Sequence, residues 1–256
     1  MIDDVVLFVL VLARVSVFVA FFPLFSKKQL PNQVKAGLAT ALSIFWLADA
    51  KNVLPSLSFD QIGSFLFLFL VIKEICIGIL LSLVLGLFFW PARIAGSYVA
   101  QELGLSLASI SDPGSQDSST LVSRVFESFS MMIFFALNLH HFVIVSIHLS
   151  FNQTLTRIGL VDLPTEELVT AFNRTSDYGL LIVAPLMVLL MLVTLVLAFL
   201  NRAAPALNLF SVGMSIRVGL GGLLMFLFCP ILFGAIEIYF YRVQEDVELL
   251  MQSLAG

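Results

Sequence analysis

The sequence predicts an all-α integral membrane protein, and three observations support this prediction. From Tyr178 to Asn201 the chain runs for 24 residues without a charged side chain, and from Val218 to Ile236 it runs for a further 19. Each run can cross a hydrocarbon core of ~30 Å as a helix, which takes ~20 apolar residues. The 256 residues are 60% hydrophobic and 12% charged, whereas an average soluble domain has ~25% charged residues.

Six hydrophobic helical regions follow from the apolar runs and the residues that interrupt them. Pro23 ends the first region, and the short second region follows Pro31, because proline fits the end of a helix but removes a backbone hydrogen bond inside it. Lys73 and Glu74 interrupt the third region. The six regions cover about residues 5–25, 34–50, 61–90, 121–151, 178–200 and 212–241. The N-terminal run follows an acidic start, unlike a signal peptide, and is expected to be a retained helix.

Two polar loops separate these regions. Residues 109–120 are rich in Ser and Asp and contain a Pro-Gly breaker, so this loop is not expected to face lipid. Residues 157–177 are acidic, and Thr165 is positioned to cap a short helix within them. Counting lysines and arginines on alternate sides of the helices gives seven on one side and four on the other. The positive-inside rule then predicts that both termini lie outside the cytoplasm.

Charged side chains inside apolar regions need an explanation, since each costs at least ~2.5–3.5 kcal/mol at the centre of a membrane. A proton or ion relay would require several acids along one helical stripe, and the sequence has none. We therefore expect these charges to pair within an assembly or to be surrounded by protein. Lys73 and Glu74 are adjacent and point ~100° apart on a helix, so each is expected to find its partner elsewhere. The charged residues are Arg14, Lys73, Glu74, Glu102 and Glu237.

The sequence contains no recognisable catalytic, cofactor or metal motif. His140 and His141 lack the glutamate and the i+4 spacing of a His-Glu-x-x-His zinc site. Cys76 and Cys229 lie in apolar runs and form no Cys-x-x-Cys pair. A net charge of −4 argues against nucleic acid as a partner. Glycines spaced eight apart, such as Gly78 and Gly86, predict close approach between helices.

Several short motifs follow one another along nearly the whole chain. They are Leu12-Ala13-Arg14, Pro23-Leu24-Phe25, Leu30-Pro31, Lys73-Glu74-Ile75-Cys76-Ile77-Gly78, Gln101-Glu102-Leu103-Gly104, Asp112-Pro113, Asn138-Leu139-His140-His141 with Ser150-Phe151, and the signature Arg202, Pro205, Asn208 and Phe210. Together they resemble the R subunit of the flagellar type III export gate and its homologue in virulence injectisomes. Two positions depart from the family pattern: Ala206 replaces a glutamine, and Arg157 replaces the proline of a Pro-Ile-Gly motif. The His140–His141 pair favours the flagellar branch.

The resemblance implies a non-enzymatic, channel-forming subunit made of helical hairpins that stack into a helical hetero-oligomer. The chain would be a single membrane domain resembling a fusion of the P and Q subunits, with residues 1–177 P-like and 178–256 Q-like. Its implied partners are the P and Q subunits, a B-type switch protein and unfolded flagellar proteins in transit. The implied location is the bacterial inner membrane at the flagellar basal body, and no cofactor is implied.

The resemblance also implies roles for particular residues. Arg14, Lys73, Glu74 and Glu102 would pair between subunits or within the membrane. The 109–120 loop would be a plug that projects into the channel, with Ile110 sealing it and Ser111, Asp112, Pro113 and Gly114 keeping the backbone hydrated. An ordinary solvent-exposed connector is the alternative for this loop.

Two other classes of protein were weighed against the export gate. A stand-alone secondary transporter would have inverted halves around discontinuous helices, and the two halves of this chain show no such symmetry. An intramembrane hydrolase would need a nucleophile or metal ligands that the sequence lacks. Partner dependence distinguishes the first alternative, because a transporter would purify on its own.

Overall fold

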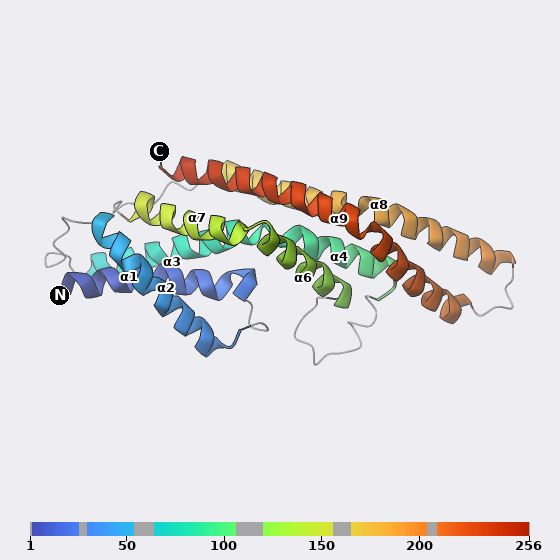
Figure 1. Ribbon diagram of the computed structural model, residues 1–256, viewed down its shortest axis with the longest axis horizontal. Coiled ribbons are helices and arrows are strands. Elements are labelled where there is room, and N and C mark those ends of the chain that lie inside the picture. Colours follow the sequence, from blue (N-terminus) through green and yellow to red (C-terminus); the bar gives the residue numbers. More distant parts are fainter. Residues whose placement is uncertain are drawn as a thin grey trace. The chain divides into compact units, whose positions relative to one another are not determined.

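The computed structural model describes residues 2–25, 30–53, 64–105, 120–155, 165–203 and 209–255. Every element of regular secondary structure in these ranges is a helix, which confirms the predicted fold class (Figure 1). By the contacts between its residues, the chain forms two units. The first comprises Met1–Leu87, Asn138–Thr170 and Gln244–Gly256, and the second comprises Phe88–Leu137 and Ala171–Val243.

The first unit is organised around α1 (Ile2–Phe21). This helix packs against both α2 (Asn32–Val53) and α3 (Ser64–Gly86), and α2 crosses α1 obliquely in Figure 1. The inward face of α1 is apolar and almost fully buried. Helix α1 ends before Pro23, which begins the short 3₁₀ helix η1 (Pro23–Phe25). A fourth helix, α7 (Leu139–Thr154), contacts α2. Residues of the buried α1 face include Leu7, Val11, Val15, Phe18 and Val19.

Helix α3 is continuous through Lys73 and Glu74, so the two charges interrupt the apolar run of the third region but not its helix. Both side chains are buried and paired, which removes the need for the helix to break around them. The chain instead leaves the helix after Gly86, where a turn over residues 87–89 leads to α4. The charges therefore lie within a long apolar helix and not at its end.

The second unit contains α4 (Trp90–Glu102) packed on α6 (Leu121–Ala136). Pro91 occupies the first turn of α4, where its missing N–H leaves no helical bond unmade. At the other end Gly104 has φ +74°, while the N–H of Leu105 bonds to the carbonyl of Ala100. This arrangement is a Schellman cap, which needs the left-handed conformation that glycine adopts without strain.

Helix α6 begins at a cap that the sequence encodes locally. Thr120 has an extended backbone, and its Oγ1 accepts a hydrogen bond of 3.2 Å from the N–H of Ser123. The core of the second unit then forms around three buried phenylalanines. The ring centroids of Phe88 and Phe240 are 5.5 Å apart, and Phe134 lies 5.7 Å from Phe88. Their edge-to-face geometry is the arrangement that aromatic rings favour.

The predicted helix over residues 121–151 is wrong at its centre, because the chain breaks between α6 and α7. Asn138 has φ 57° and ψ 24°, in the left-handed region that ends a helix. Asparagine adopts this conformation more readily than most residues, because its short side chain tolerates it. Asn138, His140 and His141 are polar residues at this position, but the hydropathy of the whole segment does not predict a break.

The last two helices are longer than the sequence predicted. Helix α8 (Thr165–Ala203) begins at Thr165, so most of the predicted acidic loop is helical. Residues 165–177 contain neither glycine nor proline, and Glu166 and Glu167 lie in the first turn, where the helix dipole favours negative charge. Helix α9 (Leu209–Ala255) likewise extends beyond residues 212–241 at both ends.

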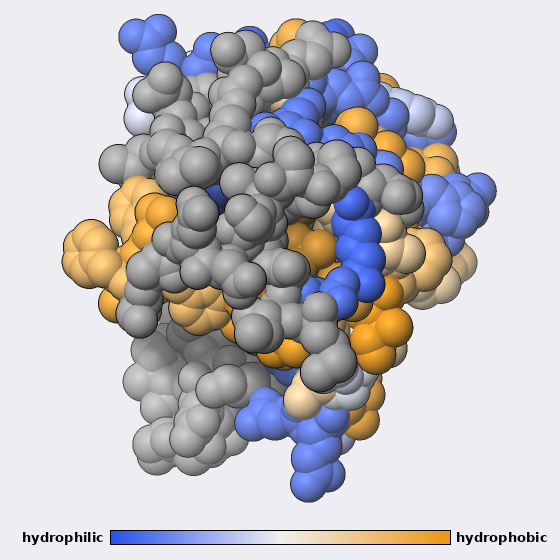
Figure 2. All heavy atoms as spheres, turned by 90° about the vertical axis from the view of Figure 1, so that its left-hand side faces the viewer, coloured by the Kyte–Doolittle hydropathy of each residue, from blue (hydrophilic) through white to orange (hydrophobic). Residues whose placement is uncertain are grey.

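Four described helices are long and apolar enough to cross a membrane. They include the segments Asp4–Phe21, Phe65–Gly86, Thr165–Ala203 and Gly213–Met251, and α6 with α7 makes a fifth if the pair is one span. Large apolar side chains are exposed in both units; Phe65 is 86% exposed, Phe199 70% and Phe226 77%. Figure 2 shows one face of the molecule, on which hydrophobic side chains reach the surface beside hydrophilic ones. Such a surface suits lipid or other membrane proteins and not water.

Candidate functional site

The first unit contains a buried cluster of charged and polar side chains centred on Arg14. Arg14 lies in the middle of α1, and its side chain is 0% exposed. Its Nε donates a hydrogen bond of 2.6 Å to Glu74 Oε2 on α3. Its Nη1 and Nη2 each donate a bond of 2.9 Å, to Ser150 Oγ and Thr154 Oγ1 on α7. The guanidinium group thus bonds to two other helices through three nitrogens.

Ser150 and Thr154 accept these bonds because their own protons are already donated within α7. The Ser150 hydroxyl donates to the carbonyl of Ile147 at 2.9 Å, and the Thr154 hydroxyl donates to the carbonyl of Ser150 at 2.7 Å. The two residues are four apart and therefore lie on the same face of the helix. Each oxygen keeps a lone pair for the arginine, so the polar contacts in this apolar surrounding are satisfied.

Lys73 brings a second positive charge to the same carboxylate. Its Nζ lies 3.4 Å from Glu74 Oε1 and donates a bond of 2.9 Å to the backbone carbonyl of Thr154. The expectation that adjacent Lys73 and Glu74 each need a partner elsewhere is therefore only half right. Both reach other helices, but the flexible lysine side chain also folds back to its neighbour. One carboxylate lies between two cations, which gives the ionised cluster a net charge of +1.

Aromatic rings and a close helix crossing enclose the cluster. The Arg14 Cζ lies 4.3 Å from the centroid of the Phe151 ring, a cation–π contact. Phe151 in turn packs against Trp46 of α2, with ring centroids 5.9 Å apart. At Gly78 a Cβ atom would come within 2.6 Å of the Arg14 carbonyl oxygen. The glycine therefore allows α3 to approach the backbone of α1 next to the arginine.

Three of the other predicted site residues belong to the second unit, and the rest fall outside the described residues. Glu102 is half-buried near the end of α4 in the second unit, and Arg202 is exposed in the last turn of α8. Phe210 lies in α9, while Pro205 and Asn208 fall outside the described residues. The proposed plug residues Ile110, Ser111, Asp112, Pro113 and Gly114 also fall outside them.

Sequence reasoning missed the hydroxyl and aromatic partners of the cluster. Ser150 and Phe151 belong to one of the motifs that carry the family resemblance, but neither they nor Thr154 and Trp46 are predicted from the sequence as partners of Arg14. The i, i+4 pair of hydroxyl residues in an apolar helix was the available signal. Among the described residues, no group of three or more His, Cys, Asp or Glu side chains is arranged to hold a metal ion. The geometry supports a structural role, in which buried charges hold three helices together.

Comparison with known proteins identifies the group to which this chain is related. The model of the family described as "Bacterial export proteins, family 1" matches residues 5–243. The chain belongs to this family. The match includes all of the buried cluster, from Arg14 to Thr154.

Members of the family with curated descriptions are similar over most of their length. The chain is 25% identical over 253 residues to "Flagellar biosynthetic protein FliR" of Bacillus subtilis, which covers 97% of this chain and 95% of that protein. It is 29% identical to the protein of the same name in Escherichia coli, and the match covers 86% of this chain and 83% of that protein. It is also 28% identical to "Surface presentation of antigens protein SpaR" of Shigella flexneri, covering 90% and 87%. The chain is thus similar to flagellar biosynthetic proteins and to a surface presentation of antigens protein, which agrees with the predicted resemblance.

Proposed function

We propose that this chain is a structural, channel-forming subunit of the flagellar type III protein export gate, through which unfolded flagellar proteins cross the inner membrane at the basal body. The observation that carries this proposal is the family match over residues 5–243, together with two flagellar relatives that align over more than four-fifths of both chains. The similarity to SpaR makes an injectisome export gate the second candidate.

The exposed surface supports a role within a larger membrane assembly. Helices α8 and α9 carry large apolar side chains that are more than half exposed, among them Met191 and Phe199 on α8 and Phe226 on α9. We propose that P and Q subunits cover part of this surface and that a B-type switch protein contacts the assembly. We also propose that Glu102 pairs with a charge on another subunit. In the same proposal, residues 1–177 form the P-like portion of the chain and residues 178–256 form the Q-like portion.

The buried cluster distinguishes this proposal from a stand-alone transporter. A transporter site near the middle of the membrane would place its ionisable groups around a cavity that admits an ion or substrate. Here Arg14 and Glu74 are 0% and 1% exposed, and both are bonded to neighbouring side chains within one unit. Fully bonded charges with no access to solvent suit a scaffold.

The first test is native mass spectrometry of the tagged chain, expressed alone and together with candidate P and Q subunits from the same genome. We expect a defined hetero-oligomer with one copy of this chain, and a low yield of the chain alone. Complementation of flagellar and injectisome null strains then separates the two candidates by motility and by effector secretion. A stable monomer that ignores both partners would instead support the transporter.

We also propose that the 109–120 loop plugs the channel of the assembled gate. Its irregular, polar sequence needs water or protein around it at membrane depth. Deleting residues 111–119 is expected to raise the leak of small ions across membranes that contain the assembled complex. Replacing the same residues by a Gly-Ser segment of equal length but leaving Ile110 in place is the matched control. An unchanged leak in a deletion complex of normal composition would show that the loop is a connector.

A further inference from the structure

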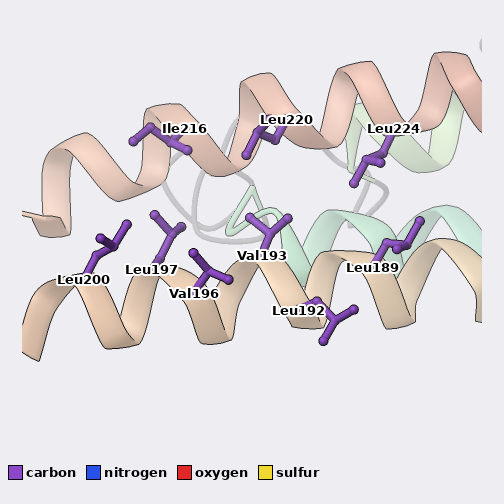
Figure 3. A pocket seen from close by; sticks show the side chains of 9 residues that line it. All are labelled: Leu189, Leu192, Val193, Val196, Leu197, Leu200, Ile216, Leu220 and Leu224. Atoms are coloured by element: carbon purple, nitrogen blue, oxygen red, sulfur yellow. The ribbon is translucent and has the colours of Figure 1, made fainter.

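The second unit contains an apolar groove between α8 and α9 with a volume of about 380 Å³. All of the side chains that line it are Leu, Val or Ile. In Figure 3, Val193 and Leu197 of α8 point toward α9, while Leu220 and Leu224 of α9 point back toward α8. Its volume lies within the ~300–1,000 Å³ typical of sites for small molecules.

The length of the groove matches one acyl chain. On α8 the lining runs from Leu189 to Leu200, which at 1.5 Å per residue corresponds to about 16 Å. Half of a ~30 Å hydrocarbon core, the depth that an acyl chain of one leaflet occupies, is about 15 Å. Both helices belong to segments long and apolar enough to cross a membrane, so lipid chains have access to a groove between them.

Positive charge lies at one end of the groove only. Leu200 and Ile216 line the same end in Figure 3. Arg202 is exposed in the last turn of α8, two residues beyond Leu200, and the first turn of α9 contains no acidic residue. Arg217, which follows Ile216, shares the helical face of Leu220 and Leu224 by i, i+3, i+7 spacing.

Arg217 supplies a second observation at this end of the groove. Its Nε is buried, and no hydrogen-bond acceptor contacts it within the part of the chain that the structure describes. A buried guanidinium N–H without an acceptor is costly, and a phosphate oxygen is an acceptor for which arginine is well suited. Arg217 lies four residues inside the apolar segment Gly213–Met251. From this position the long arginine side chain can reach the headgroup layer of a membrane.

We infer that the α8–α9 groove binds one acyl chain of an anionic phospholipid, whose phosphate is held by Arg217 with Arg202 nearby. Two arginines favour a headgroup with net negative charge over a zwitterionic one, because the ammonium group of a zwitterionic headgroup offsets the charge of its phosphate and is repelled by the arginines. The aliphatic lining excludes water and holds the chain. This inference does not depend on the proposed export function, because the groove and the two arginines would bind the lipid whatever the chain does.

The test is native mass spectrometry of the full-length chain, in whatever assembly it is extracted, titrated with phosphatidylglycerol and separately with phosphatidylcholine. We expect tighter binding of phosphatidylglycerol. Arg217→Gln is expected to weaken it about fivefold, the effect of one arginine near an anionic lipid surface, while Arg217→Lys retains most of it. Val193→Phe is expected to fill the groove and abolish binding, whereas Val188→Phe, at an exposed α8 position outside the lining, is the matched control.

Three results would overturn the inference. Equal binding of the two lipids would show that charge is not recognised, and an unchanged affinity in Arg217→Gln would exclude this arginine. If Val193→Phe left lipid binding intact but released another protein chain, the groove would be a contact for a partner helix. The elution volume and helical content of each variant check that it is folded, and the comparison of the two lipids together with Val193→Phe keeps the test decisive if the glutamine variant fails to assemble.

Discussion

Replacing Glu74 with glutamine is expected to lower the free energy of unfolding of the first unit by about 3–5 kcal/mol, the cost of removing one partner of a buried ion pair. The substitution preserves the shape of the side chain but removes the only carboxylate that contacts Arg14 and Lys73 in the described cluster. Both cations are then left in a surrounding with almost no access to water, since their side chains are 0% and 4% exposed. Uncompensated charge of this kind is far more costly than a lost hydrogen bond.

The measurement is unfolding by denaturing detergent in mixed micelles, followed by tryptophan fluorescence. The chain has two tryptophans, and Trp46 packs against Phe151 beside the cluster. In a Trp90→Phe background the emission therefore reports on the first unit alone. We expect a transition shifted to lower denaturant, together with a loss of assembled protein in cells.

Glu127→Gln is the matched control for this prediction. Glu127 pairs with Arg93 at 2.6 Å, but the Arg93 side chain is 51% exposed. Water solvates the charge that remains, so the same chemical change is expected to cost only about 0–1 kcal/mol. Adding Arg14→Met to Glu74→Gln removes one of the stranded cations and is expected to recover part of the loss. Equal effects of the two Glu→Gln variants would show that the buried cluster does not stabilise the fold.

The helical membrane fold could be predicted from the sequence because its main cause is local. An uncharged run of about 20 residues can be recognised within a single segment, and so can a proline at its end. The structure has a helix at each of the predicted runs. The break at Asn138 depends on a single left-handed residue inside an apolar run. The continuity of α3 through Lys73 and Glu74 depends on partners supplied by α1 and α7. Neither is encoded in the hydropathy of the segment itself.

The candidate site was predictable to the same extent. The cost of burying charge singled out Arg14, Lys73 and Glu74 before any geometry was known. Their hydroxyl partners are harder to predict. The i, i+4 spacing of Ser150 and Thr154 is only a weak signal, because serine and threonine in apolar helices usually bond to their own backbone and need no other role. Ser150 and Thr154 do this as well, at 2.9 Å and 2.7 Å. Only the pairing of α7 with α1, which lies more than 130 residues away in sequence, reveals their second bond.

Replacing Gly78 with alanine is expected to lower the free energy of unfolding of the first unit by about 1–3 kcal/mol, the usual cost of overpacking a buried contact. The new Cβ would lie 2.6 Å from the Arg14 carbonyl oxygen and 3.3 Å from Val17 Cβ. Since the oxygen belongs to the backbone, no side-chain rotation relieves the contact, and α3 must move away from α1. That movement also lengthens the bonds between Arg14 and Glu74, so the steric and electrostatic costs act together.

Gly37→Ala provides the control for Gly78→Ala within the same unit. Gly37 lies in α2, and a Cβ there meets no atom within 4 Å in the described structure. The same substitution is then expected to be neutral or to stabilise by up to ~1 kcal/mol, through the helix propensity of alanine. A double-mutant cycle of Gly78→Ala with Glu74→Gln separates the two costs, because residues that act through one contact are not additive. We expect the double variant to lose less than the sum of the single losses. Strict additivity would mean that the close α1–α3 approach and the buried ion pair stabilise the unit independently.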